Sequence, residues 1–183
     1  MSHIHIAIVV GSLRKASFNR QLAQAITKMA PAGVQFKEVA LGELPLYNQD
    51  ADGNEVAAVK QFRDALRGVD GVLFITPEYN RSMPGVLKNA LDQGSRPYGH
   101  SVWDGKPAAV VGMSPGAIGT AAAQQHLRNV LAYLNMPTLG QPEMMLQYKD
   151  DFFTADGAVD ERSHAYVQKF VELVVAWVKQ HKV

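Results

Sequence analysis

The sequence predicts an α/β fold in which a parallel sheet carries helices on both faces. Five segments with the apolar pattern of strands alternate with segments of helical periodicity, and this alternation is typical of parallel α/β sheets. One strand segment, residues 71–76, is a short continuous apolar run, as expected for a central strand covered on both faces. A chain of 183 residues suits one domain with a sizeable core, so we expect a single domain over residues 1–183.

Each expected element has a local signal. The strands are expected at residues 4–10, 34–41, 71–76, 108–113 and 138–146, the last weakened toward a sheet edge by Gly140 and Pro142. The first helix has apolar residues at spacings of four, four and three: Phe18, Leu22, Ile26 and Met29. Further helices are expected at residues 55–67, at about 84–93, after the loop at 114–119, and at about 160–179. Gly94 is expected to end the second of these.

Right-handed crossovers leave few topologies for five such units. The leading one is the flavodoxin-like order 2-1-3-4-5, a three-layer sandwich with a five-stranded parallel sheet. Ligands of open α/β sheets bind beyond the carboxyl ends of the strands where the strand order reverses, here between the first and third strands. The loops after the first, third and fourth strands are therefore expected to meet at one crevice.

The loop between the first strand and the first helix has the composition of an anion site. A helix N-terminus favours an anion through its unpaired N–H groups and the positive end of its dipole. The loop adds side chains that donate hydrogen bonds to phosphate oxygens: Ser12, Arg14, Ser17, Asn19 and Arg20. It is neither a dinucleotide fingerprint nor a Walker A loop, since Gly11 is its only glycine. We interpret it as a cradle for a terminal phosphate; the alternative is a turn in which Ser17 caps the helix and the arginines are solvated.

The loop after the third strand offers groups that suit a flat heterocycle. A rigid turn, a carboxylate, a planar ring and an amide come from Pro77, Glu78, Tyr79 and Asn80. The alternative is an ordinary turn between a strand and a helix, which the same residues would satisfy. The loop at residues 114–119 has a weaker signal, because glycine and proline are expected in any such connection.

Two motifs in these loops resemble a known family. Residues 11–19 follow the pattern Gly-Ser-Leu-Arg-x-x-Ser-x-Asn, and residues 76–92 follow Thr-Pro-Glu-Tyr-Asn-x-Ser-x-Pro-Gly-x-Leu-Lys-Asn-Ala-x-Asp. Both resemble the NADPH-dependent FMN reductase family, and most closely its chromate and quinone reductase members. The resemblance extends from the first strand to at least Pro142 and Glu143.

The resemblance implies an FMN site built from all three loops. The FMN phosphate would be held by Ser12, Leu13, Arg14, Ser17, Phe18 and Asn19, with Leu13 and Phe18 contributing backbone contacts. The isoalloxazine would be lined by Pro77, Glu78, Tyr79 and Asn80, and on its other side by Ser114 and Gly116. Arg81 stands where members often carry tyrosine and Gln93 where an aromatic is common, and we expect both near the acceptor. The family also implies a homodimer or homotetramer with flavin sites near the subunit contacts.

The implied activity is that of a two-step (ping-pong) NAD(P)H oxidoreductase. Hydride would pass from NADPH or NADH to FMN, and electrons would then pass to a quinone, a flavin, an azo compound or a chromate-like oxyanion. Since the cofactor carries this chemistry, we expect no catalytic residue of the protein itself. The alternatives are an FMN-binding electron carrier, a class that tends to be strongly acidic whereas this chain has a net charge of +1, and a flavin-binding regulator without turnover.

Composition excludes several classes of site and partner. The absence of cysteine excludes disulfides, thiolate metal sites and cysteine nucleophiles, and the six histidines form no ligand-like cluster, so no metal site is expected. A net charge of +1 without a Lys/Arg-rich run does not indicate a nucleic-acid partner. With no leader pattern and no apolar run of about 18–20 residues, we expect a soluble cytoplasmic protein with small-molecule partners and no membrane association.

Overall fold

The computed structural model describes residues 3–182 and has the predicted parallel sheet. The strands are β1 (Ile4–Val10), β2 (Val34–Glu38), β3 (Gly71–Ile75), β4 (Ala108–Ser114) and β5 (Met144–Gln147), in the spatial order β2-β1-β3-β4-β5. The helices are α1 (Phe18–Lys28), α2 (Ala57–Arg67), α3 (Gly85–Ser95), α4 (Ala121–Tyr133) and α5 (Glu161–His181), and Gln49–Ala51 forms a short 3-10 helix. The predicted flavodoxin-like order is confirmed.

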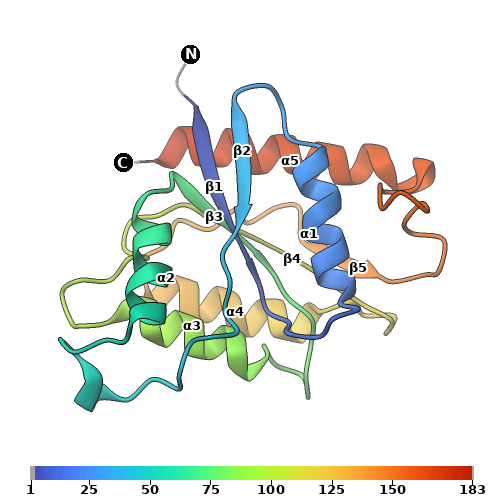
Figure 1. Cartoon of the computed structure of the whole chain (residues 1–183). Coiled ribbons are helices and arrows are strands. Elements are labelled where there is room, and N and C mark those ends of the chain that lie inside the picture. Colours follow the sequence, from blue (N-terminus) through green and yellow to red (C-terminus); the bar gives the residue numbers. More distant parts are fainter. Residues whose placement is uncertain (1–2, 183) are drawn as a thin grey trace.

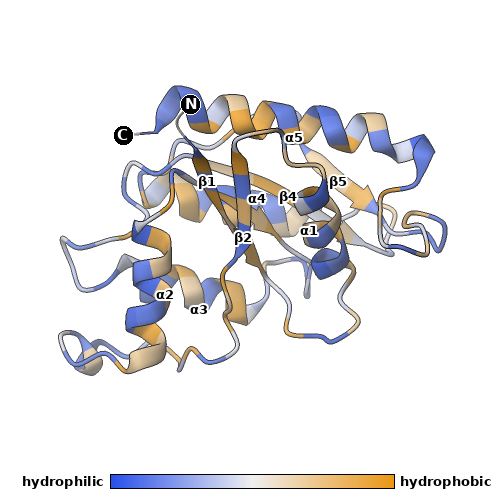
Figure 2. Ribbon diagram, turned by 45° about the horizontal axis from the view of Figure 1, so that its top comes forward, coloured by the Kyte–Doolittle hydropathy of each residue, from blue (hydrophilic) through white to orange (hydrophobic). Residues whose placement is uncertain are grey.

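Three layers follow from the alternation of side chains along the strands. On β1, Ile6 and Ile8 point into a core shared with α1 and α5, whereas Ala7 and Val9 point into a core shared with α2, α3 and α4. Figure 1 shows these two groups of helices on opposite sides of the sheet, and Figure 2 shows the central strands β1 and β3 as largely hydrophobic. None of the helices within residues 3–182 is both long and apolar enough to cross a membrane.

Two predicted strand boundaries are wrong. β2 ends at Glu38 rather than at residue 41, because the chain then leaves the sheet and buries Leu41 against the α2–α4 side. The last strand begins at Met144 rather than at residue 138: Thr138 makes only an isolated bridge to Ala108, and Pro142 has no N–H to donate to the sheet.

Gly94 does not end α3, which continues to Ser95. Its lack of a side chain serves packing instead, because a Cβ atom on Gly94 would collide with the indole ring of Trp103. That indole is completely buried, and its Nε1 donates to the Leu91 carbonyl at 3.0 Å. The irregular segment between α3 and β4 is therefore fixed to α3 through Trp103.

Candidate functional site

The carboxyl ends of β1, β3 and β4 bring the three predicted loops together. Gly11 N–H donates to the Ile75 carbonyl at 2.9 Å, and Thr76 N–H donates to the Val111 carbonyl at 3.0 Å, so the three strands end next to one another. In Figure 1 the loops after β1 and β3 both leave the lower end of the sheet. The predicted meeting of the loops at this edge is confirmed.

The first loop, residues 11–17, presents unpaired N–H groups at the start of α1. Ser17 caps the helix, because its side-chain oxygen accepts from Arg20 N–H at 3.3 Å. Within residues 3–182, no protein acceptor takes the N–H groups of Leu13, Phe18 or Asn19. Capping by Ser17 and anion binding are therefore compatible, since the cap uses only one of the free N–H groups.

Asn19 has a different side-chain role from the one expected. The residue is 2% exposed, and its side chain is bonded twice to the backbone of β4: Nδ2 donates to the Met113 carbonyl at 2.8 Å, and Oδ1 accepts from Met113 N–H at 2.9 Å. The amide therefore joins α1 to β4, and what Asn19 can offer a ligand is its backbone N–H.

The two arginines of this region also differ in role. Arg20 supports the loop from behind, because it donates to the Ser12 carbonyl at 3.2 Å and to Glu38 Oε1 at 3.1 Å. Arg14 is exposed and its guanidinium lies 4.9 Å from the centre of the Phe18 ring. Phe18 in turn stacks on Tyr148 with ring centres 3.6 Å apart. Sequence reasoning missed Tyr148, which lies just after β5 and carries no signal of its own.

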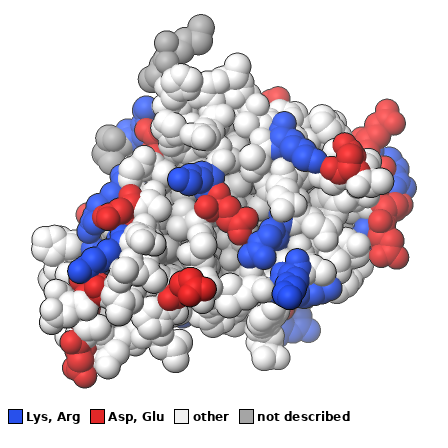
Figure 3. All heavy atoms as spheres, viewed as in Figure 1, with Lys and Arg blue, Asp and Glu red and all other residues white. Residues whose placement is uncertain are grey.

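The donors of the first loop fit a phosphate monoester such as that of FMN. Backbone N–H groups, the Ser12 and Ser17 hydroxyls and the Arg14 guanidinium gather at one helix N-terminus. No acidic residue occurs in residues 11–20, and the neighbouring Glu38 is paired with Arg20. On the face shown in Figure 3, basic side chains gather at the lower right, the side on which the first loop leaves the sheet.

The second loop folds into a tight hairpin. Tyr79 and Ser82 exchange two backbone hydrogen bonds of 3.0 Å, which leaves Asn80 and Arg81 at the tip. Both tip residues have positive φ, 51° for Asn80 and 64° for Arg81, as in a type I′ turn. Tyr79 is half exposed beside this turn, so the hairpin can present its ring to a ligand at the sheet edge.

The side chain of Glu78 joins this hairpin to α4. Its Oε2 accepts from the N–H groups of Ala122 at 2.9 Å and of Ala123 at 3.1 Å. Both groups lie in the first turn of α4, where N–H groups have no partner within the helix. The side chain is only 11% exposed. Glu78 therefore helps to fix the position of the second loop. The sequence predicts only that its carboxylate lines the ring, not this contact with α4.

The third loop is closed by Ser114. Its hydroxyl donates to the Gly119 carbonyl and also accepts from Gly116 N–H at 3.2 Å. The loop thus forms a compact turn next to the second loop, with Gly116 exposed.

Gln93 makes a structural contact, and the expectation that it lies near the acceptor stays a prediction. It is buried, and its Nε2 donates to the Pro45 carbonyl at 2.9 Å, a carbonyl that also accepts from Asn89. Gln93 therefore attaches the segment after β2 to α3.

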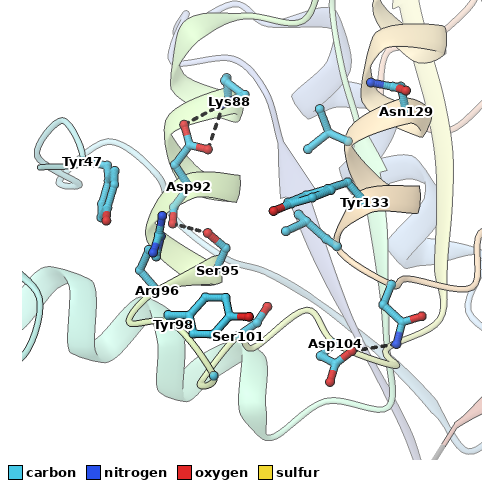
Figure 4. A pocket seen from close by; sticks show the side chains of 14 residues that line it. Tyr47, Lys88, Asp92, Ser95, Arg96, Tyr98, Ser101, Asp104, Asn129 and Tyr133 are labelled. Carbon is cyan, nitrogen blue, oxygen red and sulfur yellow. Dashed lines mark hydrogen bonds and ion pairs between the residues drawn. The ribbon is translucent and has the colours of Figure 1, made fainter. Parts of the chain in front are cut away.

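A groove of about 1090 Å³ lies between α3 and α4, toward the ends of these helices that are remote from the three loops. Figure 4 shows Lys88 and Asp92 of α3 on one side and Tyr133 of α4 on the other. Tyr98 and Tyr133 are each 88% exposed. Tyrosine and arginine, present here as Arg96, are typical of protein–protein interfaces.

Comparison with known proteins agrees with the geometry. The sequence model of the family described as NADPH-dependent FMN reductase matches residues 4–151. A 2-hydroxy-1,4-benzoquinone reductase of a Burkholderia species is 50% identical over 181 residues, which cover 98% of this chain and 99% of the relative. A quinone reductase of Pseudomonas putida is 47% identical and covers 100% of this chain and 99% of its own.

A solved structure also supports membership of this family. A flavoenzyme NAD(P)H:(acceptor) oxidoreductase from Paracoccus denitrificans superposes with a TM-score of 0.94 at 42% identity, covering 98% of this chain and 100% of its own. The chain therefore belongs to the NADPH-dependent FMN reductase family, whose flavoenzymes use FMN with NAD(P)H as co-substrate.

Proposed function

We propose that this protein reduces quinones with electrons from NAD(P)H in a ping-pong cycle at a single FMN site. The observation that carries the proposal is the meeting of three loops at the carboxyl edge of β1, β3 and β4, one of them rich in unpaired phosphate donors. Two relatives that align with nearly the full chain are named as quinone reductases, which supports a quinone as the acceptor.

Each loop has a distinct role in this proposal. Ser12, Arg14 and Ser17 bind the phosphate together with the backbone N–H groups of Leu13, Phe18 and Asn19, which have no protein acceptor within residues 3–182. Pro77, Glu78, Tyr79 and Asn80 form one wall of the ring site, with Glu78 acting mainly through its bonds to α4, and Ser114 and Gly116 form the other wall.

Bound FMN supplies the redox chemistry, since it can take a hydride from NAD(P)H and deliver electrons to a second substrate. The protein orients both substrates and requires no acid or base of its own. Tyr79, half exposed next to the hairpin, provides a planar surface against which either a nicotinamide or a quinone can stack. A common surface of this kind favours alternate occupation by the two substrates. Flavins, azo compounds and chromate-like oxyanions are further acceptors that we propose for the same site.

Initial-rate kinetics test the ping-pong proposal. Rates are measured over a grid of NADPH and 1,4-benzoquinone concentrations, with NADH in a second series. Parallel double-reciprocal lines are expected, because product nicotinamide leaves before the quinone binds. Lines that converge to the left of the ordinate would show that both substrates are bound together and would contradict alternate occupation.

We propose that the groove between α3 and α4 binds a second copy of this chain. It is lined by exposed tyrosines and by charges of both signs, among them Lys88, Asp92, Arg96 and Asp104. In a two-fold symmetric dimer the same surface of both copies meets at the contact. Since this surface carries both acidic and basic side chains, the basic side chains of one copy can pair with the acidic side chains of the other.

A further inference from the structure

Arg81 occupies a backbone conformation that its side chain makes unfavourable. It is the second central residue of the Tyr79–Ser82 hairpin, with φ of 64° directly after Asn80 with φ of 51°. Asn-Gly is the usual pair in such a turn, because asparagine tolerates the left-handed region and glycine has no Cβ to clash there. Non-glycine residues held in this region are concentrated at functional sites, where the side chain has a role that offsets the strain.

The contacts of Arg81 within residues 3–182 do not supply a structural role. The side chain is 76% exposed, and its one charged neighbour is Glu78, whose Oε1 lies 3.9 Å from Nη1, at the outer limit of an ion pair. The other oxygen of Glu78 already accepts from two N–H groups of α4, so this carboxylate is largely compensated. The Arg81 guanidinium therefore keeps most of its charge available to a ligand.

The surroundings of the hairpin tip add little negative charge on this side of the site. The residue after Arg81, Ser82, is hydrogen-bonded through Oγ to Nδ1 of His126 on α4 at 2.9 Å. Apart from Glu78, no acidic residue occurs in the chain from 76 to 91. We propose that Arg81 selects anionic electron acceptors, in particular hydroxyquinones in their ionised form; this inference rests on the proposed quinone reductase function.

A 2-hydroxy-1,4-benzoquinone is a vinylogous carboxylic acid and is ionised at neutral pH. Its charge is shared by the 2-oxygen and the 4-oxygen, and a guanidinium can donate one hydrogen bond to the charged 2-oxygen and a second to the adjacent 1-carbonyl oxygen. The overall reaction is balanced as hydroxyquinone anion plus NAD(P)H plus two protons giving benzene-1,2,4-triol and NAD(P)⁺. Unsubstituted 1,4-benzoquinone accepts the same two electrons but offers no charge to Arg81.

The test is the ratio of kcat/KM for the hydroxyquinone anion to kcat/KM for 1,4-benzoquinone, measured on FMN-loaded protein at low salt. Arg81→Gln and Arg81→Gly are expected to lower this ratio roughly fivefold, the size of one contact between exposed unit charges about 4 Å apart. Arg81→Lys keeps the positive charge, so its ratio is expected to stay close to that of the wild type. The matched control is Arg67→Gln, which removes an exposed arginine at the end of α2 remote from the loops. Any effect of Arg81 on NAD(P)H cancels in the ratio.

Three outcomes separate this inference from the function on which it rests. A lowered ratio in the Gln and Gly variants, retained in Arg81→Lys and Arg67→Gln and reduced in wild type by added salt, supports it. Reduction of both quinones with an unchanged ratio overturns the inference and leaves the proposed function intact. Failure of the wild type to reduce either quinone overturns both. Arg81→Gly also guards against misfolding, because glycine is at ease in the left-handed region.

Discussion

Removing two phosphate donors of the first loop together should release FMN without unfolding the protein. The double variant Arg14→Ala/Ser17→Ala takes away one exposed guanidinium and one buried hydroxyl. A hydrogen bond to a charged group contributes about 1.5–3 kcal/mol, and an exposed charge pair about 4 Å apart contributes about 1 kcal/mol. The sum is about 3 kcal/mol, which corresponds to a roughly hundredfold rise in the Kd of FMN.

The assay is titration of apoprotein with FMN, followed by fluorescence, with retention of the yellow colour on dialysis as a second readout. Loss of the Ser17 cap also costs about 1 kcal/mol of folding stability, so melting temperatures are measured in parallel. The matched control is Arg67→Ala/Asp160→Ala, which removes an exposed arginine and the cap of α5 outside the three loops. If the Arg14/Ser17 variant binds FMN as tightly as this control, the first loop does not hold the phosphate.

Three further predictions concern the supports of the site and the groove. Asn19→Ala should lower the free energy of unfolding by about 2–3 kcal/mol, because it leaves the buried Met113 N–H and carbonyl without partners; chemical denaturation measures this, and a change within error would contradict it. Glu78→Ala should weaken FMN binding and destabilise the fold by about 1–2 kcal/mol, since α4 loses an acceptor at its N-terminus. Glu78→Gln keeps an acceptor oxygen, so it should lower the FMN affinity measured by titration and the melting temperature less than Glu78→Ala does. Tyr98→Ser/Tyr133→Ser should shift the mass measured by light scattering toward the monomer, and an unchanged mass would place the subunit contact elsewhere.

The fold could be predicted because its signals are local. Apolar runs and helical spacings mark the strands and helices, and right-handed connections then leave few strand orders. The ends of the two outer strands could not be read in this way. Whether a residue such as Val39 or Thr138 extends a strand depends on the neighbouring strand, which a local window does not contain.

The sequence predicts which loops lie at this edge of the sheet, but not the side-chain contacts within them. The hydroxyls and arginines of the first loop have recognisable chemistry, but the bonds of Asn19 to Met113 span 94 residues, and those of Glu78 to α4 span 44 and 45. No sequence pattern encodes such contacts, because they depend on how distant elements pack. The left-handed turn shows the same limit: Asn80 is a common residue for it, whereas Arg81 gives no hint of a positive φ.

Anaerobic mixing of the FMN-loaded protein with NADPH tests the central claim most directly. If the three loops form the site of an NAD(P)H-dependent reductase, the visible absorbance of the flavin should bleach on mixing and return when a quinone is added, with release of free FMN excluded by filtration. Flavin that stays oxidised with both NADPH and NADH would contradict the reductase and favour an FMN-binding carrier or regulator.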